Sequence, residues 1–154
     1  MRRSDKECTE KLLRTHFLRD AQILHLALSV PDGVPYIVPL NYVYDEAIYF
    51  HSAAEGRKVT LLRQNPFAGF AVSEQVRIRV SHDNPCATGT NYRSVAGKGK
   101  VSFIESTEGK SQILNKLMAK YAQSQPFEYK DKMLNKVLVI KLEILEMTFK
   151  VDLR

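Results

Sequence analysis

The chain lacks most of the features that would assign a 154-residue protein to a specialised class. No apolar run approaches the roughly 20 residues that a membrane-spanning helix needs, and the first residues contain no apolar segment typical of a secretory signal. The only cysteines, Cys8 and Cys86, lie far apart and match no metal-binding spacing, so two reduced thiols are expected. These absences predict a cytoplasmic protein with no metal site and no membrane partner.

Motifs of several enzyme and nucleic-acid-binding classes are also absent. The sequence has no HExxH motif, no glycine-rich Walker or dinucleotide-binding loop, and no Ser, His and Asp order typical of a hydrolase. It has no long Lys/Arg run, no zinc-finger spacing and no RNP-type aromatic motif, so nucleic acid is not an expected partner despite the net charge of +6.

The composition that remains is that of a globular protein, with 44% hydrophobic and 26% charged residues. Its length fits a single domain over residues 1–154. The positive charge is uneven: residues 57–100 hold eight Lys or Arg against two acids, whereas the rest of the chain balances at fifteen against fifteen. A small phosphorylated ligand explains such a local excess better than a general polyanion-binding surface does.

Apolar periodicity predicts a mainly β chain. The connections between the first strands, such as the turn at residues 31–33, are too short for parallel crossovers, which favours an antiparallel meander. About six antiparallel strands with few helices imply a small closed or split barrel with flanking helices. We expect strands at 23–30, 36–44, 47–51, 67–80, 92–104 and 136–151, a helix capped by Thr9 that ends near Asp20, and helices at 59–63 and 107–122.

Two strands carry signs of irregularity. In the last strand the apolar residues are even-numbered up to Ile144 and odd-numbered from Leu145, and one inserted residue, a bulge at a barrel corner, would explain the change. Gly97 and Gly99 predict a bulge or a close backbone approach in the strand at 92–104. In the helix at 107–122 the expected buried stripe is Ile113, Leu114, Leu117, Met118 and Tyr121.

The run at residues 51–58, HSAAEGRK, follows a predicted strand and opens a predicted helix. Unpaired N–H groups at a helix start favour an anion, Gly56 allows close backbone approach, and Arg57 and Lys58 supply charge-assisted hydrogen bonds. The run therefore predicts a phosphate site. The alternative is a turn followed by two solvated cations on a surface helix.

Several segments, in this order along the chain, together resemble the nitroimidazole-resistance (Nim) branch of the pyridoxamine 5′-phosphate oxidase-related flavoproteins. The resemblance extends from Arg2-Arg3 to Lys150, and its strength lies in the joint order and spacing of pieces that are weak alone. The pieces are residues 35–42 (PYIVPLNY), His51-Ser52-Ala53, Gly56-Arg57-Lys58, Asn65-Pro66, Cys86, residues 92–95 (YRSV), and Gly97 with Gly99.

The resemblance implies an FMN-binding split β-barrel of the antiparallel Greek-key type, and a homodimer with flavin at the subunit interface. FMN is expected rather than FAD. By position, Ser52, Arg57 and Lys58 would hold the flavin phosphate, with Ala53 and Gly56 in the same loop. The strand made of Val38, Pro39, Leu40, Asn41 and Tyr42 would run along the isoalloxazine, and Arg93 and Ser94 would lie close to the cofactor.

Some residues keep two interpretations. His51, the one catalytic candidate, either faces the flavin or is a structural histidine. Tyr36, Tyr42 and Tyr92 are more simply strand-packing residues than flavin-stacking ones. Arg77 and Arg79 are most simply a solvated face. Cys86 has no obvious base beside it, so no nucleophilic role is assigned.

Three functions follow from the resemblance. The first is a flavin-dependent oxidoreductase that takes electrons from NADH or NADPH and passes them to a small acceptor such as a nitroaromatic. The second is a non-catalytic flavin-binding, storage or redox-sensing module, and the third is a haem-binding or haem-degrading protein. Oxidation of pyridoxamine 5′-phosphate is not expected, because the sequence has no Trp and lacks the Arg-Leu-x-Pro ending of true oxidases.

Overall fold

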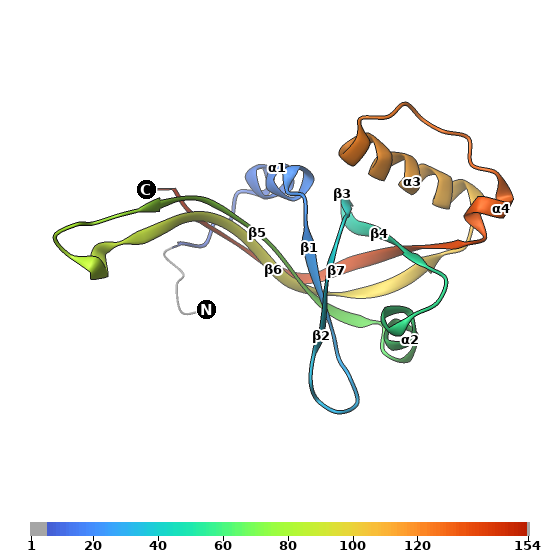
Figure 1. The fold of residues 1–154 in the computed structure, drawn as a ribbon, viewed down its shortest axis with the longest axis horizontal. Helices are drawn as coiled ribbons and strands as arrows, with labels where there is room; N and C mark the ends of the chain where they lie inside the picture. The colour runs from blue at the N-terminus through green and yellow to red at the C-terminus, as the bar shows by residue number, and fades with distance from the viewer. Residues whose placement is uncertain (1–5, 154) are drawn as a thin grey trace.

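The computed structural model describes residues 6–153 and contains one seven-stranded antiparallel sheet with helices packed on it (Figure 1). This confirms the mainly β prediction. The sheet order is β2-β1-β5-β6-β7-β4-β3. The elements are α1 (Lys11–Asp20), β1 (Leu24–Leu28), β2 (Tyr36–Leu40), β3 (Val43–Asp45), β4 (Ala47–Ala53), α2 (Arg57–Gln64), β5 (Phe67–Arg79), the 3-10 turn η2 (Pro85–Ala87), β6 (Gly89–Ile104), α3 (Thr107–Ala122), α4 (Asp131–Leu134) and β7 (Val137–Asp152).

The strand order shows why the sheet must curl. β2 and β3 occupy its two opposite edges, yet only Asn41 and Tyr42 separate them in the chain. In a flat sheet, six inter-strand spacings of about 4.8 Å would hold the edges roughly 29 Å apart. Three Cα–Cα steps reach at most about 11 Å. The sheet therefore closes on itself there, as a barrel does, and the predictions of one strand over 36–44 and of a simple meander are wrong.

The inside of the curled sheet forms the main core. Alternate residues of β1 (Leu24, Leu26 and Leu28) point inward and are at most 2% exposed. Phe17 of α1 closes this core and stacks on Phe149 of β7, with ring centroids 5.5 Å apart. A smaller cluster on the outer side of β7 packs under α3 and consists of Val43, Ile113, Leu117 and Val139.

Helix boundaries follow local capping. α3 starts at Thr107 because the Ser106 side chain accepts a hydrogen bond from the Gly109 amide, and it ends at Gln123 in the left-handed region. Two details correct the sequence analysis. Met118 is 42% exposed, so it lies outside the buried stripe. The residue before α1 is Glu10 rather than Thr9, with no side-chain cap.

The predicted bulge lies in β7. Lys98 pairs with Glu146 and Gly99 pairs with Ile144, so Leu145 is the extra residue, and it is 56% exposed. Ile144 and Met147 therefore both pack against the main core. The glycines of β6 are needed here because a Cβ on Gly97 would lie 2.3 Å from the Glu146 carbonyl oxygen, and one on Gly99 would lie 2.4 Å from that of Glu143.

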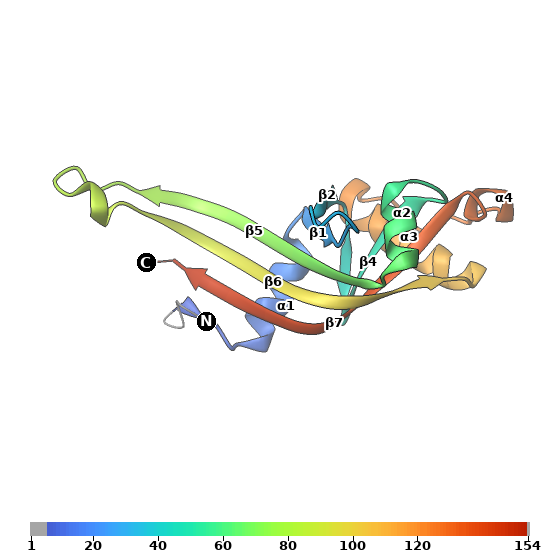
Figure 2. The ribbon, with the colours of Figure 1, turned by 90° about the horizontal axis from the view of Figure 1, so that it is seen from below.

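β5, β6 and the end of β7 continue past the barrel as a long arm (Figure 2). On one face of β5 in this arm, Val76 and Ile78 are exposed, as is Val80 just beyond the strand. Arg79, expected on a solvated face, is half-buried, with its guanidinium 3.7 Å from the buried Asp152 carboxylate. Lys6 also pairs with Asp152. No helix among residues 6–153 has the length and apolar character that crossing a bilayer requires.

Candidate functional site

The predicted phosphate loop lies between the end of β4 and the start of α2. Gly56 is the residue before the helix, with φ +124°, a conformation that side-chain-bearing residues rarely adopt. Arg57 and Lys58 form the start of the helix, whose first turn contains no acidic residue and no side-chain cap. The first N–H groups and the positive end of the helix dipole are therefore available to an anion.

The two cations rest on aromatic rings. The Arg57 guanidinium carbon lies 4.8 Å from the ring centre of Tyr36, and the Lys58 ammonium lies 5.8 Å from that of Phe50. Neither cation forms an ion pair within residues 6–153. Their charges are therefore uncommitted, and burial lowers the pKa of Lys58 from its ordinary value. A dianion at the loop would relieve this unfavourable burial.

Strand alternation separates the other loop residues. Ser52 points inward and is 8% exposed, and no hydrogen bond within the described chain uses its hydroxyl. His51 and Ala53 point to the opposite side of β4 and are exposed. The imidazole of His51 is nevertheless partly covered. This partial burial, and then the charge of Lys58, lowers the pKa of His51, which favours a neutral imidazole at pH 7. His51 thus lies close to the cations, on the face opposite Ser52.

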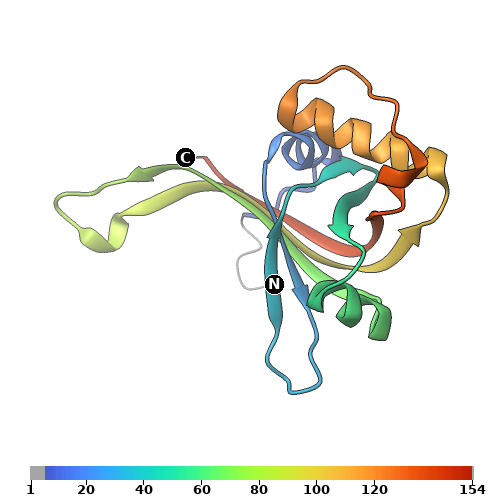
Figure 3. The same cartoon turned by 45° about the vertical axis from the view of Figure 1, so that its right-hand side comes forward.

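The helix α2 lies beside the β1–β2 hairpin (Figure 3). The contact between Arg57 and Tyr36 joins the loop to β2, where the flavin ring was expected. In β2, Val38 and Leu40 turn toward the main core, whereas Ile37 and Pro39 are exposed on the outer face. Only part of the expected ring-binding strand therefore faces outward.

Half of the residues on that outer face are small. Across the sheet, one row of partners runs from Pro39 through His25 and Ala71 to Ala96. The next row contains Ile37, Ala27, Gly69 and Lys98. The Ala and Gly positions of the two rows leave room above the sheet for a planar ring or another sheet. This surface was not predicted from the sequence, although small residues at positions 27, 69 and 71 of the expected strands pointed to it.

Tyr42 differs from expectation. Its side chain is fully buried and its hydroxyl donates to the Leu18 carbonyl at 2.8 Å. Its backbone N–H donates to the Tyr121 hydroxyl at 2.9 Å, and its carbonyl accepts from the Lys120 ammonium at 3.1 Å. Neither the ring nor the backbone of Tyr42 is therefore available to a flavin in this chain. Asn41, its neighbour in the connection between the two sheet edges, is exposed.

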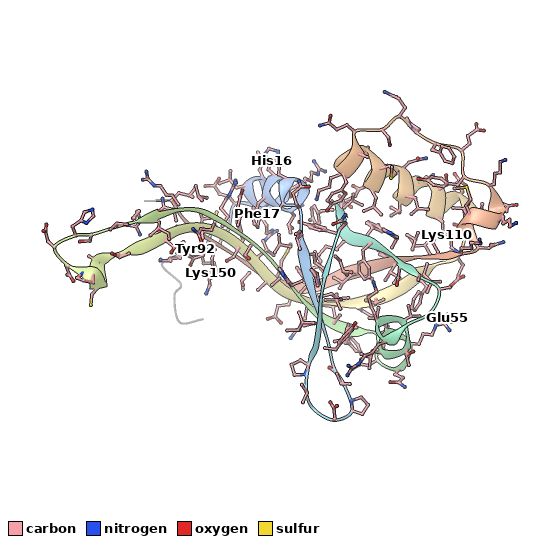
Figure 4. All side chains as sticks on the ribbon, viewed as in Figure 1. His16, Phe17, Glu55, Tyr92, Lys110 and Lys150 are labelled. Carbon is pink, nitrogen blue, oxygen red and sulfur yellow. The ribbon has the colours of Figure 1, made fainter. Side chains whose placement is uncertain are left out.

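Arg93 and Ser94 lie elsewhere in the molecule. The Arg93 guanidinium binds the Glu74 carboxylate at 2.5 Å and lies over the Phe17 ring. Figure 4 labels their neighbour Tyr92 on the arm side and Glu55 of the loop on the other side of the barrel. A single copy of the chain does not bring these residues to the phosphate loop. Arg93 instead lines a cavity of about 280 Å³ with Phe17, Ile23 and Glu74.

Residues 6–153 contain no group of three His, Cys, Asp or Glu side chains that could hold a metal ion. Cys86 lies exposed in the 3-10 turn at the end of the arm, where the Asn84 side chain accepts from its backbone amide.

Comparison with known proteins adds a family and several folds. Residues 13–151 match the sequence model of the pyridoxamine 5′-phosphate oxidase family. A protein of Bacteroides thetaiotaomicron proposed to confer resistance to 5-nitroimidazole antibiotics is 29% identical, with a TM-score of 0.83 over 94% of this chain and 86% of that one. None of the curated proteins compared with the chain matches it.

Two further structures share the fold at lower identity. The flavocytochrome Anf3 of Azotobacter vinelandii is 20% identical, with a TM-score of 0.84 over 100% of this chain and 72% of that one. An FAD- and haem-binding protein of Mycobacterium smegmatis is 19% identical, with a TM-score of 0.84 over 97% of this chain and 74% of that one.

Proposed function

Because this chain belongs to the pyridoxamine 5′-phosphate oxidase family, we propose that it binds a flavin, as FMN, with the flavin phosphate at the turn between β4 and α2. The observation that carries the proposal is the pair Arg57 and Lys58, at a helix start behind Gly56, neither of which forms an ion pair within residues 6–153. FMN ends in a single phosphate, which this one loop matches. The Ser52 hydroxyl would donate a further hydrogen bond to a phosphate oxygen.

The ring of the flavin is proposed to lie on the outer face of β2, β1 and β5. An oxidised flavin is a flat, largely apolar ring with one hydrogen-bonding edge, and Ala27, Gly69 and Ala71 leave room for such a ring. Pro39 and Ile37 would border it. Tyr36, which contacts Arg57, adjoins Ile37 in β2 but faces the main core, so this contact brings the phosphate loop to the strand that would border the ring.

We also propose a homodimer in which the second copy completes each pocket. Arg93 and Ser94 would reach the flavin of the partner subunit, because within one copy they pair with the last residues of β7, whereas Ser52 pairs with Leu138 near the start of that strand. The exposed Val76, Ile78 and Val80 on the arm, and Ile37 on the outer face, would be covered in the same association.

The proposed activity is electron transfer from NADH or NADPH to a small acceptor such as a nitroaromatic. The 29% identical protein proposed to act in nitroimidazole resistance supports this class of acceptor. The bound flavin would supply the hydride-accepting chemistry. The residues of the chain would anchor the phosphate, orient the ring and leave one ring face open, with neutral His51 as the one candidate for proton transfer.

The test is the double variant Arg57→Ala, Lys58→Ala. Because hydrogen bonds to charged groups contribute roughly 1.5–3 kcal/mol each, FMN binding should weaken by several kcal/mol in a fluorescence or calorimetric titration. The matched control is Lys130→Ala, Lys132→Ala, which removes two exposed cations outside the loop and outside the arm and should bind FMN as the parent does. Unchanged FMN affinity in the first variant would rule this site out.

A second measurement separates the catalytic proposal from a flavin-storage or redox-sensing module. Steady-state oxidation of NADPH or NADH by the flavin-loaded protein should require the nitroaromatic acceptor. Flavin that binds tightly but is not reduced by either nucleotide would leave only the non-catalytic function. Hydrogen peroxide release with pyridoxamine 5′-phosphate, at a rate comparable with that of a true oxidase, would instead assign vitamin B6 oxidation.

A further inference from the structure

A second positively charged surface lies away from the phosphate loop, between α1, β3 and α3. It consists of two adjoining cavities of about 310 Å³ and 460 Å³, both lined by Arg19 and Tyr44. Figure 1 shows α1 and α3 on the same side of the barrel, with β3 between them. We call this surface the α1–α3 groove. Its charged lining residues are Lys11, Arg14, Arg19, Asp45, Glu46, Lys116 and Lys120.

Cations outnumber carboxylates in the α1–α3 groove by five to two. Of the two acids, Asp45 is already paired with Lys116, and this partner lowers the pKa of Asp45. Lys11, Arg14 and Arg19 form no ion pair within residues 6–153. Three side chains on one helix thus bring positive charge to one hollow that Glu46 balances only in part, and a low-dielectric wall strengthens the attraction for an anion there.

The junction of the two cavities is held in place by the barrel. The Lys120 ammonium donates to the carbonyl oxygens of Ala21 at 2.7 Å and Tyr42 at 3.1 Å, and it lies 4.1 Å from the centre of the Tyr42 ring. These contacts tie α3 to the point where the two sheet edges meet. The groove is therefore a preformed surface rather than a gap between independent helices.

The lining is mixed in polarity. Val43, Ile144 and Met147 provide apolar surface, and Tyr44 lines both cavities. Its volume is within the range of small-molecule sites, about 300–1,000 Å³. A ligand that matches this lining has a planar or apolar part joined to two or more negative charges.

We propose that the α1–α3 groove binds the diphosphate group of a nucleotide, with Arg14 and Arg19 as its principal ligands. Arg is suited to this task because its planar guanidinium donates two parallel hydrogen bonds to phosphate oxygens. Lys11 adds charge at one end of the groove, and Tyr44 offers a ring for the base. The diphosphate comes either from a free nucleoside diphosphate or from the dinucleotide electron donor, and only the second source rests on the proposed function.

Calorimetric titration of the flavin-loaded protein tests the proposal with pyrophosphate, ADP and NADPH as probes. We expect ADP to bind more tightly than pyrophosphate, and Arg14→Gln, Arg19→Gln to weaken ADP binding at least tenfold. Arg77→Gln, an exposed arginine on the arm, is the matched control and should bind ADP as the parent does. If NADPH competes with ADP and the double variant raises the KM for NADPH, the groove holds the electron donor. If NADPH does not compete, it holds a free nucleotide.

The variant Arg57→Ala, Lys58→Ala keeps this proposal separate from the flavin site. ADP binding that survives in this variant, with FMN lost, supports two independent anion sites. The proposal is overturned if ADP does not bind, or if ADP binding is lost with Arg57 and Lys58 but retained in Arg14→Gln, Arg19→Gln. Circular dichroism of each variant establishes that a loss of binding is not a loss of folding.

Discussion

Gly56 and Gly33 have the same conformational role, but only Gly56 lies at the candidate phosphate loop. Both have positive φ angles, +124° and +81°, and an added Cβ on either would meet no atom within 4 Å. Both positions have room for a side chain, and they differ only in where they lie in the fold. Gly56 precedes the helix of the phosphate loop, and Gly33 lies in the β1–β2 turn. An alanine at either position carries backbone strain alone.

We expect Gly56→Ala and Gly33→Ala each to lower the free energy of unfolding by about 1–2 kcal/mol, measured by urea denaturation of the flavin-free protein. Only Gly56→Ala should also weaken FMN binding, because it displaces the amides at the helix start. Equal FMN affinities for the two variants would mean that the turn at Gly56 does not hold the phosphate.

The pKa of His51 gives a pH dependence with a definite sign. Burial and the Lys58 charge place it below the ordinary value of 6.5, so the unfolded chain binds more protons than the folded chain as the pH falls through 6.5. The free energy of unfolding of the flavin-free protein should therefore decrease on acidification below pH 6.5. His51→Gln should remove this contribution, and Lys58→Met should reduce it. An identical pH profile in His51→Gln would show that another group is responsible.

At the scale of elements, the bulge in β7 explains the two glycines of the neighbouring strand. A Cβ on Gly97 would meet the Phe70 ring at 2.7 Å as well as the Glu146 carbonyl oxygen, whereas one on Gly69 would meet only ordinary contacts, the nearest at 3.6 Å. Gly97→Ala should destabilise the flavin-free protein by about 1–3 kcal/mol in urea denaturation. Gly69→Ala, the matched control, should change stability little or increase it slightly. A tolerated Gly97→Ala would mean that β6 and β7 can separate at the bulge.

Sequence predicted those elements whose signals are local. The phase change between Ile144 and Leu145 identified the bulge, and the regular apolar repeat predicted a helix at 107–122, the bounds of α3. The break at Asn41 and Tyr42 could not be read in this way. That segment has the apolar character of one strand, and only the closure of the sheet makes the chain cross there from one edge to the other.

The candidate site shows the same division. The strand, the glycine and the helix start of the candidate phosphate loop were predictable because they follow one another in the chain, whereas phosphate binding there stays a prediction. The structural role of Tyr42 could not be predicted from the sequence, since its hydrogen-bond partners Lys120 and Tyr121 are 78 and 79 residues away in the chain. The four-residue helix α4 was also missed, because so short a segment has no repeat to recognise.

Across the whole fold, the arm leaves several large apolar side chains exposed that the chain itself does not cover. In the arm, the Asp152 carboxylate of β7 pairs with Arg79 of β5 and with Lys6, which precedes α1. Its apolar side chains on β5, however, contribute little to the core of the same chain, since Val76 is 49% exposed and Ile78 is 56% exposed. An arm that projects from a barrel with apolar residues outward is well suited to a second copy of the chain.

Ile78→Asp tests whether the arm makes the proposed homodimer. A carboxylate buried in an apolar interface is strongly unfavourable, so this variant should sediment as a monomer at concentrations where the parent is a dimer. FMN binding should weaken with it, although Ile78 is remote from the phosphate loop, because Arg93 and Ser94 would no longer reach the flavin of the partner subunit. Met133→Asp, at an α4 residue that is 46% exposed, is the control and should remain dimeric with parental FMN affinity. A monomeric Ile78→Asp protein that binds FMN as tightly as the parent would show that each copy holds its flavin alone, and would remove Arg93 and Ser94 from the site.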